Sequence, residues 1–118
     1  MGQLGQGSAS GIGRSINPTS VTVDRQGTLY VGDAVHQDVA KFSPAGRQVA
    51  RWDLTEEGAT VDQMVVRAGP AGNVVIVLVA RVKSGSEYVV MQRRSPGGKI
   101  LNVWRLPNHP PFDTGETV

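Results

Sequence analysis

The residues best suited to acid–base or metal chemistry lie in one short stretch, in which His36 stands between Asp33 and Asp38. Imidazole and carboxylate groups are common metal ligands, and a histidine beside a carboxylate can transfer protons. The alternative is a solvated loop in which Asp33, like Asp24 before it, accepts hydrogen bonds from nearby backbone amides. The only other histidine is His109, so a multi-histidine site would need a symmetric oligomer that gathers copies of His36 around its axis.

Two tryptophans recur at the same place in an internal repeat. The stretch SPAGRQVARWDL, residues 43–54, aligns without a gap with SPGGKILNVWRL, residues 95–106, and pairs Trp52 with Trp104. An exposed ring in each repeat would offer a flat apolar surface for stacking against a sugar. The alternative is that each ring packs between neighbouring units and fixes their spacing. Both interpretations stay open at this point.

The elements that must position these residues are short strands. Runs rich in β-branched and aromatic residues alternate with turns that contain Gly or Pro, and no helical period extends over three turns. The strands predicted for the first repeat are 20–24, 28–33, 38–42 and 47–54, and those for the second are 63–67, 73–82, 88–94 and 99–106. The unbroken apolar run at 74–79 predicts a strand that is covered on both faces.

Four antiparallel strands in a repeat of 40–50 residues are typical of a β-propeller blade. The expected fold class is therefore all-β, with two four-stranded antiparallel blades. The predicted organisation is a Gly-rich lead-in at 1–16, one blade at 17–58, a second at 59–107 and a Pro-rich tail at 108–118. Because propellers close with roughly four to eight blades, two blades predict either a fragment of a larger propeller or a ring completed by oligomerisation.

The first repeat resembles a known family. The segment INPTSVTVDRQGTLYVGDAVHQDVAKFSPAGR resembles the NHL-type β-propeller repeat at Pro18, Val21, Val23, Asp24, Gly27, Tyr30, Val31, Asp33, Val39 and Phe42. The second repeat shares the strand order and the final turn and strand, but it lacks the Tyr-Val-x-Asp signature. The resemblance implies a six-bladed ring, and hence a trimer of this chain. It also implies a further alternative, because some lyases with similar propellers use His and acidic residues around a metal.

The family pattern and this chain differ before the third strand. NHL blades often carry Asn-x-Arg there, whereas this chain has His36, Gln37 and Asp38. The role of that arginine in the family is therefore not carried over.

Composition narrows the classes of partner. The net charge is only +2, and the doublet Arg93–Arg94 with a few scattered cations is more typical of charges that protect an edge strand than of a phosphate-binding patch. Nucleic acid is therefore not the expected partner. There is no Cys and no pattern of a secretory signal or membrane span, so a soluble chain is expected while its compartment stays open.

These observations favour a non-enzymatic binding and scaffold module that acts through protein–protein interaction and self-assembly. One alternative is an oligomeric carbohydrate-binding propeller that uses Trp52 and Trp104. The other is a metal-dependent, lyase-like enzyme that uses His36 with Asp33. The candidate binding residues are Asp33, His36, Asp38, Trp52 and Trp104; the sequence assigns no catalytic residue, metal or cofactor.

Overall fold

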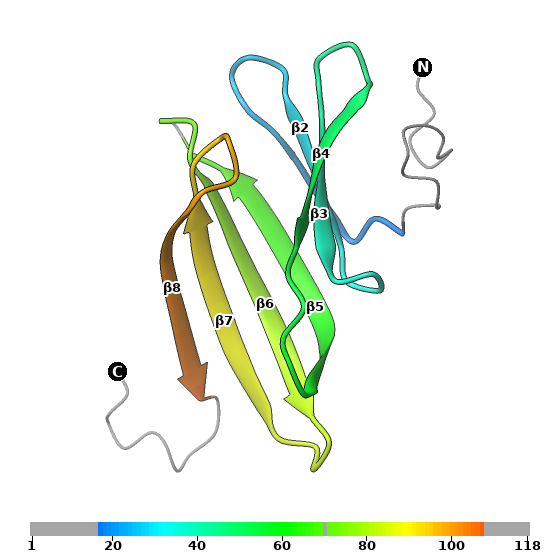
Figure 1. Ribbon diagram of the computed structural model, residues 1–118, viewed down its shortest axis with the longest axis vertical. Helices are drawn as coiled ribbons and strands as arrows, with labels where there is room; N and C mark the ends of the chain where they lie inside the picture. The colour runs from blue at the N-terminus through cyan, green and yellow to red at the C-terminus, as the bar shows by residue number, and fades with distance from the viewer. Residues whose placement is uncertain (1–16, 70, 108–118) are drawn as a thin grey trace.

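The chain forms two four-stranded antiparallel sheets in the computed structural model, which describes residues 17–69 and 71–107 (Figure 1). Sheet A consists of β1 (Ser20–Val23), β2 (Leu29–Asp33), β3 (Asp38–Phe42) and β4 (Gln48–Asp53). Sheet B consists of β5 (Ala59–Ala68), β6 (Val74–Val82), β7 (Glu87–Arg94) and β8 (Ile100–Pro107). Each sheet is a simple up-and-down meander with its strands in chain order. The all-β fold class with two four-stranded antiparallel sheets is thus confirmed.

The predicted lead-in at 1–16 and tail at 108–118 lie outside the described residues. The described residues contain no helical segment with the length and hydrophobicity that a bilayer crossing requires.

The two sheets share the same turn and the same irregularity. Gly46 and Gly98 have φ angles of 90° and 98°, and each amide donates to the carbonyl of the Ser that opens its turn, at 2.8 and 2.9 Å. The pairing register also shifts at the same place in both sheets, after Lys41 in β3 and after Arg93 in β7. The repeat in the sequence is therefore also a repeat in backbone geometry.

The sequence placed the start of β5 wrongly. The predicted strand began at residue 63, whereas β5 begins at Ala59. Residues 59–62 precede the predicted strand, but they belong to β5, which continues through a bulge between Val61 and Gln63. Arg81 on β6 donates to the Asp62 carboxylate at 2.9 Å, so the extra residue of the bulge is held at the surface.

The core lies between the two sheets, which pack face to face (Figure 1). From sheet B, the buried side chains include Val66 on β5, Ile76 and Leu78 on β6 and Val90 on β7. The edge strands β1 and β5 meet directly. The amides of Val66 and Ala68 donate to the hydroxyls of Ser20 and Thr22, at 3.0 and 3.2 Å. Apolar burial and these hydrogen bonds together join the sheets.

The strand β6 is covered on one face rather than two. Its residues Val74, Ile76 and Leu78 are buried against sheet A, whereas Val75 and Val77 on the other face are only partly buried. The expectation that both faces are covered is therefore not met by the described residues. The physical reason is the order of the layers, because sheet A packs on only one side of sheet B.

Candidate binding surface

The loop residues singled out in the sequence do come together at one end of sheet A. Asp33 and Asp38 are directly opposite one another in the β2–β3 pairing. The Nδ1 atom of His36 lies 2.6 Å from the Asp33 carboxylate, which also accepts the backbone amides of His36 and Asn17 at 3.0 and 2.9 Å. Burial raises the pKa of Asp33, but these hydrogen bonds outweigh it, so the pKa lies below its ordinary value.

The hydrogen bonds of the Asp33 and Asp38 carboxylates hold the loop and the neighbouring strand in place. Asp33 is 2% exposed and closes the loop, in which Gln37 takes a left-handed φ of 59°. Asp38 accepts a hydrogen bond from Arg51 at 2.8 Å across the neighbouring strand. Between residues 17 and 107, apart from residue 70, no group of three or more His, Cys, Asp or Glu side chains is placed to hold a metal ion. The geometry therefore fits a rigid loop better than a metal centre.

The two tryptophans have different surroundings although their local sequences match. Trp52 is 7% exposed, between the sheets. Its ring lies 5.5 Å from the ring of Tyr30 and 5.3 Å from the Arg94 guanidinium. Trp104, on the last strand, is 45% exposed. Packing between units therefore describes Trp52, and Trp104 alone offers an exposed ring.

The sequence did not reveal that Arg94 takes part in the contact between the two sheets. It was interpreted as part of a basic strip that protects an edge, but β7 is an interior strand and Arg94 is buried. Its Nε donates to Gln92 at 2.9 Å and its Nη1 donates to the carbonyl of Gly98 at 3.3 Å. Burial lowers its pKa below the ordinary value. The cation therefore stacks on Trp52 within the joint between the sheets.

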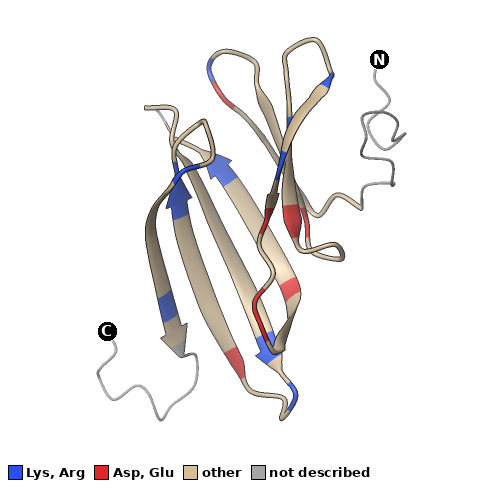
Figure 2. Ribbon diagram, viewed as in Figure 1, with Lys and Arg blue, Asp and Glu red and all other residues tan. Residues whose placement is uncertain are grey.

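The most distinctive exposed surface is the face of sheet B that points away from sheet A. Alternation along the strands and the pairing of β8 with β7 give this outer face of sheet B an apolar area made of Val65, Val75, Val77, Val79, Val89, Met91, Trp104 and Leu106, with Arg67 and Arg93 toward the strand ends. Val65 and Leu106 are 44% and 40% exposed. Figure 2 shows that charged residues lie near the strand ends of this sheet, while the middle of β6 and β7 carries none. A continuous apolar patch of this kind is typical of an interaction site.

The linker between the sheets carries a buried acid. Glu56 accepts hydrogen bonds from the Tyr88 hydroxyl at 2.7 Å and from Arg105 at 3.1 and 3.0 Å. Burial raises the pKa of Glu56, but the bonds from Arg105 and Tyr88 outweigh it and the pKa is lowered. Burial and the adjacent carboxylate raise the pKa of Tyr88 to about 12. These contacts hold the linker against β7 and β8.

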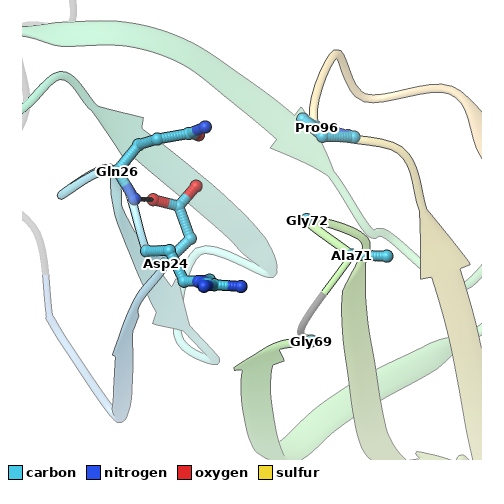
Figure 3. A pocket seen from close by; sticks show the side chains of 7 residues that line it. Asp24, Gln26, Gly69, Ala71, Gly72 and Pro96 are labelled. Atoms are coloured by element: carbon cyan, nitrogen blue, oxygen red, sulfur yellow. Dashed lines mark hydrogen bonds between the residues drawn. The ribbon is translucent and has the colours of Figure 1, made fainter.

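A cleft opens at the end of sheet A opposite to the His36 loop, between the tips of the two sheets (Figure 3). It has a volume of about 460 Å³ and is lined by Asp24, Arg25, Gln26, Gly69, Ala71, Gly72 and Pro96. The Asp24 carboxylate accepts the amides of Gln26 and Thr28 in its own turn, both at 2.9 Å. The cleft therefore offers one arginine and mainly small residues, with little chemistry to recognise a ligand.

No protein-family model and no curated protein sequence matches this chain. Solved structures that are similar to it include the following two. A protein of unknown function from Bacteroides caccae shares 13% identity at a TM-score of 0.40, over 75% of this chain and 45% of that one. A streptogramin B lyase shares 12% identity at a TM-score of 0.43, over 80% of this chain and 42% of that one. The chain spans less than half the length of either, and at these TM-scores neither likeness bears on what it binds.

Proposed function

We propose that this chain is a non-enzymatic binding and scaffold module, built as two blades of an NHL-like propeller, that acts through protein–protein association. The partner is a protein that presents its own apolar β-sheet face to the outer face of sheet B. The observation that carries the proposal is the exposure of Trp104 together with Val65 and Leu106 on one sheet face whose charged residues lie toward the strand ends. Water contact with such a face is unfavourable, and covering it would stabilise the chain by roughly 25 cal/mol for each Å² of apolar surface.

The loop at His36 supports this reading rather than a catalytic one. Asp33 is committed to the loop backbone and to His36, and Asp38 is committed to Arg51. A general base or metal ligand must be able to reach a substrate or an ion, and both carboxylates are buried.

The test is whether a protein covers this face in the native host. The chain has no Cys, so Leu106→Cys places a single thiol on the face, and Ser84→Cys in an exposed turn is the matched control. We expect a maleimide to label Cys at 106 much more slowly in native extract than in dilute purified protein, and to label the control equally in both. Equal labelling of both variants in both settings would contradict the proposal.

A carbohydrate-binding module is the second candidate, and one observation favours it. Trp104 exposes its ring beside a polar pair on the same sheet, in which Arg93 donates to the side-chain Oδ1 of Asn102 at 2.9 and 2.6 Å. A stacked sugar would need such groups for its hydroxyls. Glycan-array binding that is lost on Trp104→Ala and retained on the interior variant Trp52→Phe would favour this candidate over protein association.

A further inference from the structure

We infer that the partner on the outer face of sheet B is a second copy of this chain, docked head to tail through the outer face of its sheet A. The apolar side chains on the outer face of sheet A are Val21, Val23, Leu29, Val31, Ala40, Phe42 and Val49. Val31, Ala40 and Phe42 are already buried in a cluster of their own, so the docking surface consists of the exposed Val21, Val23 and Val49. The inference rests on the proposed function, because it names the occupant of the same surface. The contact repeats, between two chains, the packing that joins sheet A to sheet B within one chain.

The joint within the chain shows how one sheet holds the next. Trp52 of sheet A packs against the turn at the tip of sheet B so closely that a Cβ on Gly98 would lie 2.7 Å from the indole Nε1. Lys41 reaches the same turn, and its Nζ donates to the carbonyl of Pro96 at 2.6 Å. A tryptophan and a cation of one sheet therefore clasp the Ser-Pro-x-Gly turn of the next.

Each chain also carries the tryptophan and the turn of a second such joint, and neither has a partner among the described residues. Trp104 is the repeat counterpart of Trp52 and is 45% exposed. Gly46 is the counterpart of Gly98 and has nearly the same φ, but a Cβ there would meet nothing within 4 Å. The free ring and the open turn lie on opposite outer faces, so they can meet only between two chains.

The strand register identifies which residues of sheet B correspond to Trp52 and Lys41 of sheet A. Trp52 pairs with Val39 across β3 and β4, and Trp104 pairs with Met91 across β7 and β8. Lys41 and Arg93 each precede the register shift of their sheet. Arg93 therefore stands where Lys41 stands, and in the docked pair it would donate to the carbonyl of Pro44, the counterpart of Pro96.

The outer face of sheet A, which would receive the second chain, corresponds residue by residue to the face of sheet B that sheet A covers. Val21 pairs with Val31 in sheet A. The corresponding pair in sheet B is Val66 with Ile76, and sheet A covers that pair within the chain. On the outer face of sheet A, Val21 and Val49 are each 53% exposed. Docking would therefore bury apolar side chains on both partners.

One part of the joint cannot be repeated between chains. Within the chain, the hydroxyls of Ser20 and Thr22 accept the edge amides of β5, but their counterparts in sheet B are Val65 and Arg67, which have no hydroxyl. The contact between chains therefore has fewer hydrogen bonds, and we expect it to depend on concentration. Because the two docking faces differ, the contact is heterologous and builds a closed ring or an open array.

Two variants of the full-length chain test the inference, one on each face. Trp104→Arg blocks the outer face of sheet B, and Val49→Arg blocks the outer face of sheet A. Val35→Arg, at a loop residue that is 63% exposed, is the matched control. We expect each blocked variant to be a single chain of 12.5 kDa by analytical ultracentrifugation, while the control assembles like the wild type. An equimolar mixture of the two blocked variants should form a 1:1 pair and nothing larger, because only one contact is intact.

The pair in the mixture also shows that both variants are folded, so a loss of assembly cannot be assigned to misfolding. If Trp104→Arg is monomeric while Val49→Arg still assembles, sheet B docks on itself and the head-to-tail contact is wrong. If the wild type is monomeric while Leu106→Cys is protected in native extract, the self-contact is overturned but the proposed function stands. If the wild type is monomeric and the thiol is not protected, both are overturned.

Discussion

Gly46 and Gly98 occupy the same place in two matching turns, but their neighbours differ. In both positions a residue with a Cβ is strained by the positive φ, at a cost of roughly 1–2 kcal/mol. Only at Gly98 would that Cβ also overlap the Trp52 ring, which adds roughly 1–3 kcal/mol. We therefore predict that Gly98→Ala lowers the free energy of unfolding more than Gly46→Ala does, in urea titrations of the dilute chain. Equal losses would show that Trp52 does not rest on this turn.

The carboxylate of Glu56 makes the free energy of unfolding depend on pH. Its folded pKa lies below the ordinary value of 4.5, so its contribution is present above that pH and is lost as the pH falls through the folded pKa. We predict that Glu56→Gln lowers stability by about 1–2 kcal/mol at neutral pH and has less effect at low pH. The exposed neighbour variant Glu57→Gln is the control. A loss that is the same at both pH values would contradict the role of the charge.

At the scale of elements, β1 holds the edge of β5 through two side chains. We predict that Ser20→Ala with Thr22→Val costs about 1 kcal/mol per hydrogen bond and speeds hydrogen exchange at the amides of Val66 and Ala68. Ser84→Ala, in the exposed β6–β7 turn, should leave this exchange unchanged. Protection that persists at Val66 in the double variant would mean that packing alone holds the strands together.

The elements also show what the sequence can and cannot predict. Strands of β-branched residues between Gly and Pro turns are local features, and the predicted order of all eight strands matches the structure. The start of β5 was missed because Thr60 and Asp62 are polar and a bulge interrupts the alternation. The burial of Arg94 was missed because its partner, Trp52, comes from the other repeat.

The two tryptophans show where local sequence stops being informative. Trp52 and Trp104 stand in matching segments, yet one is 7% and the other 45% exposed. The difference comes from the order of the layers, because sheet B follows sheet A and nothing in the described residues covers the far side of sheet B. Because the two segments match, the sequence predicts the same environment for both rings. It could therefore propose both tryptophans as candidates, but it could not single out Trp104 as the exposed one.

At the scale of the whole molecule, the chain is a repeat unit with two unlike apolar outer faces. In stacked repeats each unit buries its faces against its neighbours, and the terminal units need polar outer faces. Here both outer faces carry exposed valines, Val21 and Val49 on sheet A and Val65 on sheet B. Exposed valines on both outer faces are typical of an internal repeat, and we expect other protein to cover them.

The most direct test of this account is the mass of the purified wild-type chain across a dilution series, measured by multi-angle light scattering. We predict a whole multiple of 12.5 kDa at high concentration, which falls toward a single chain on dilution. A mass of 12.5 kDa at every concentration, together with labelling of Leu106→Cys in native extract as fast as that of Ser84→Cys, would contradict the claim that the outer face of sheet B is a protein interface.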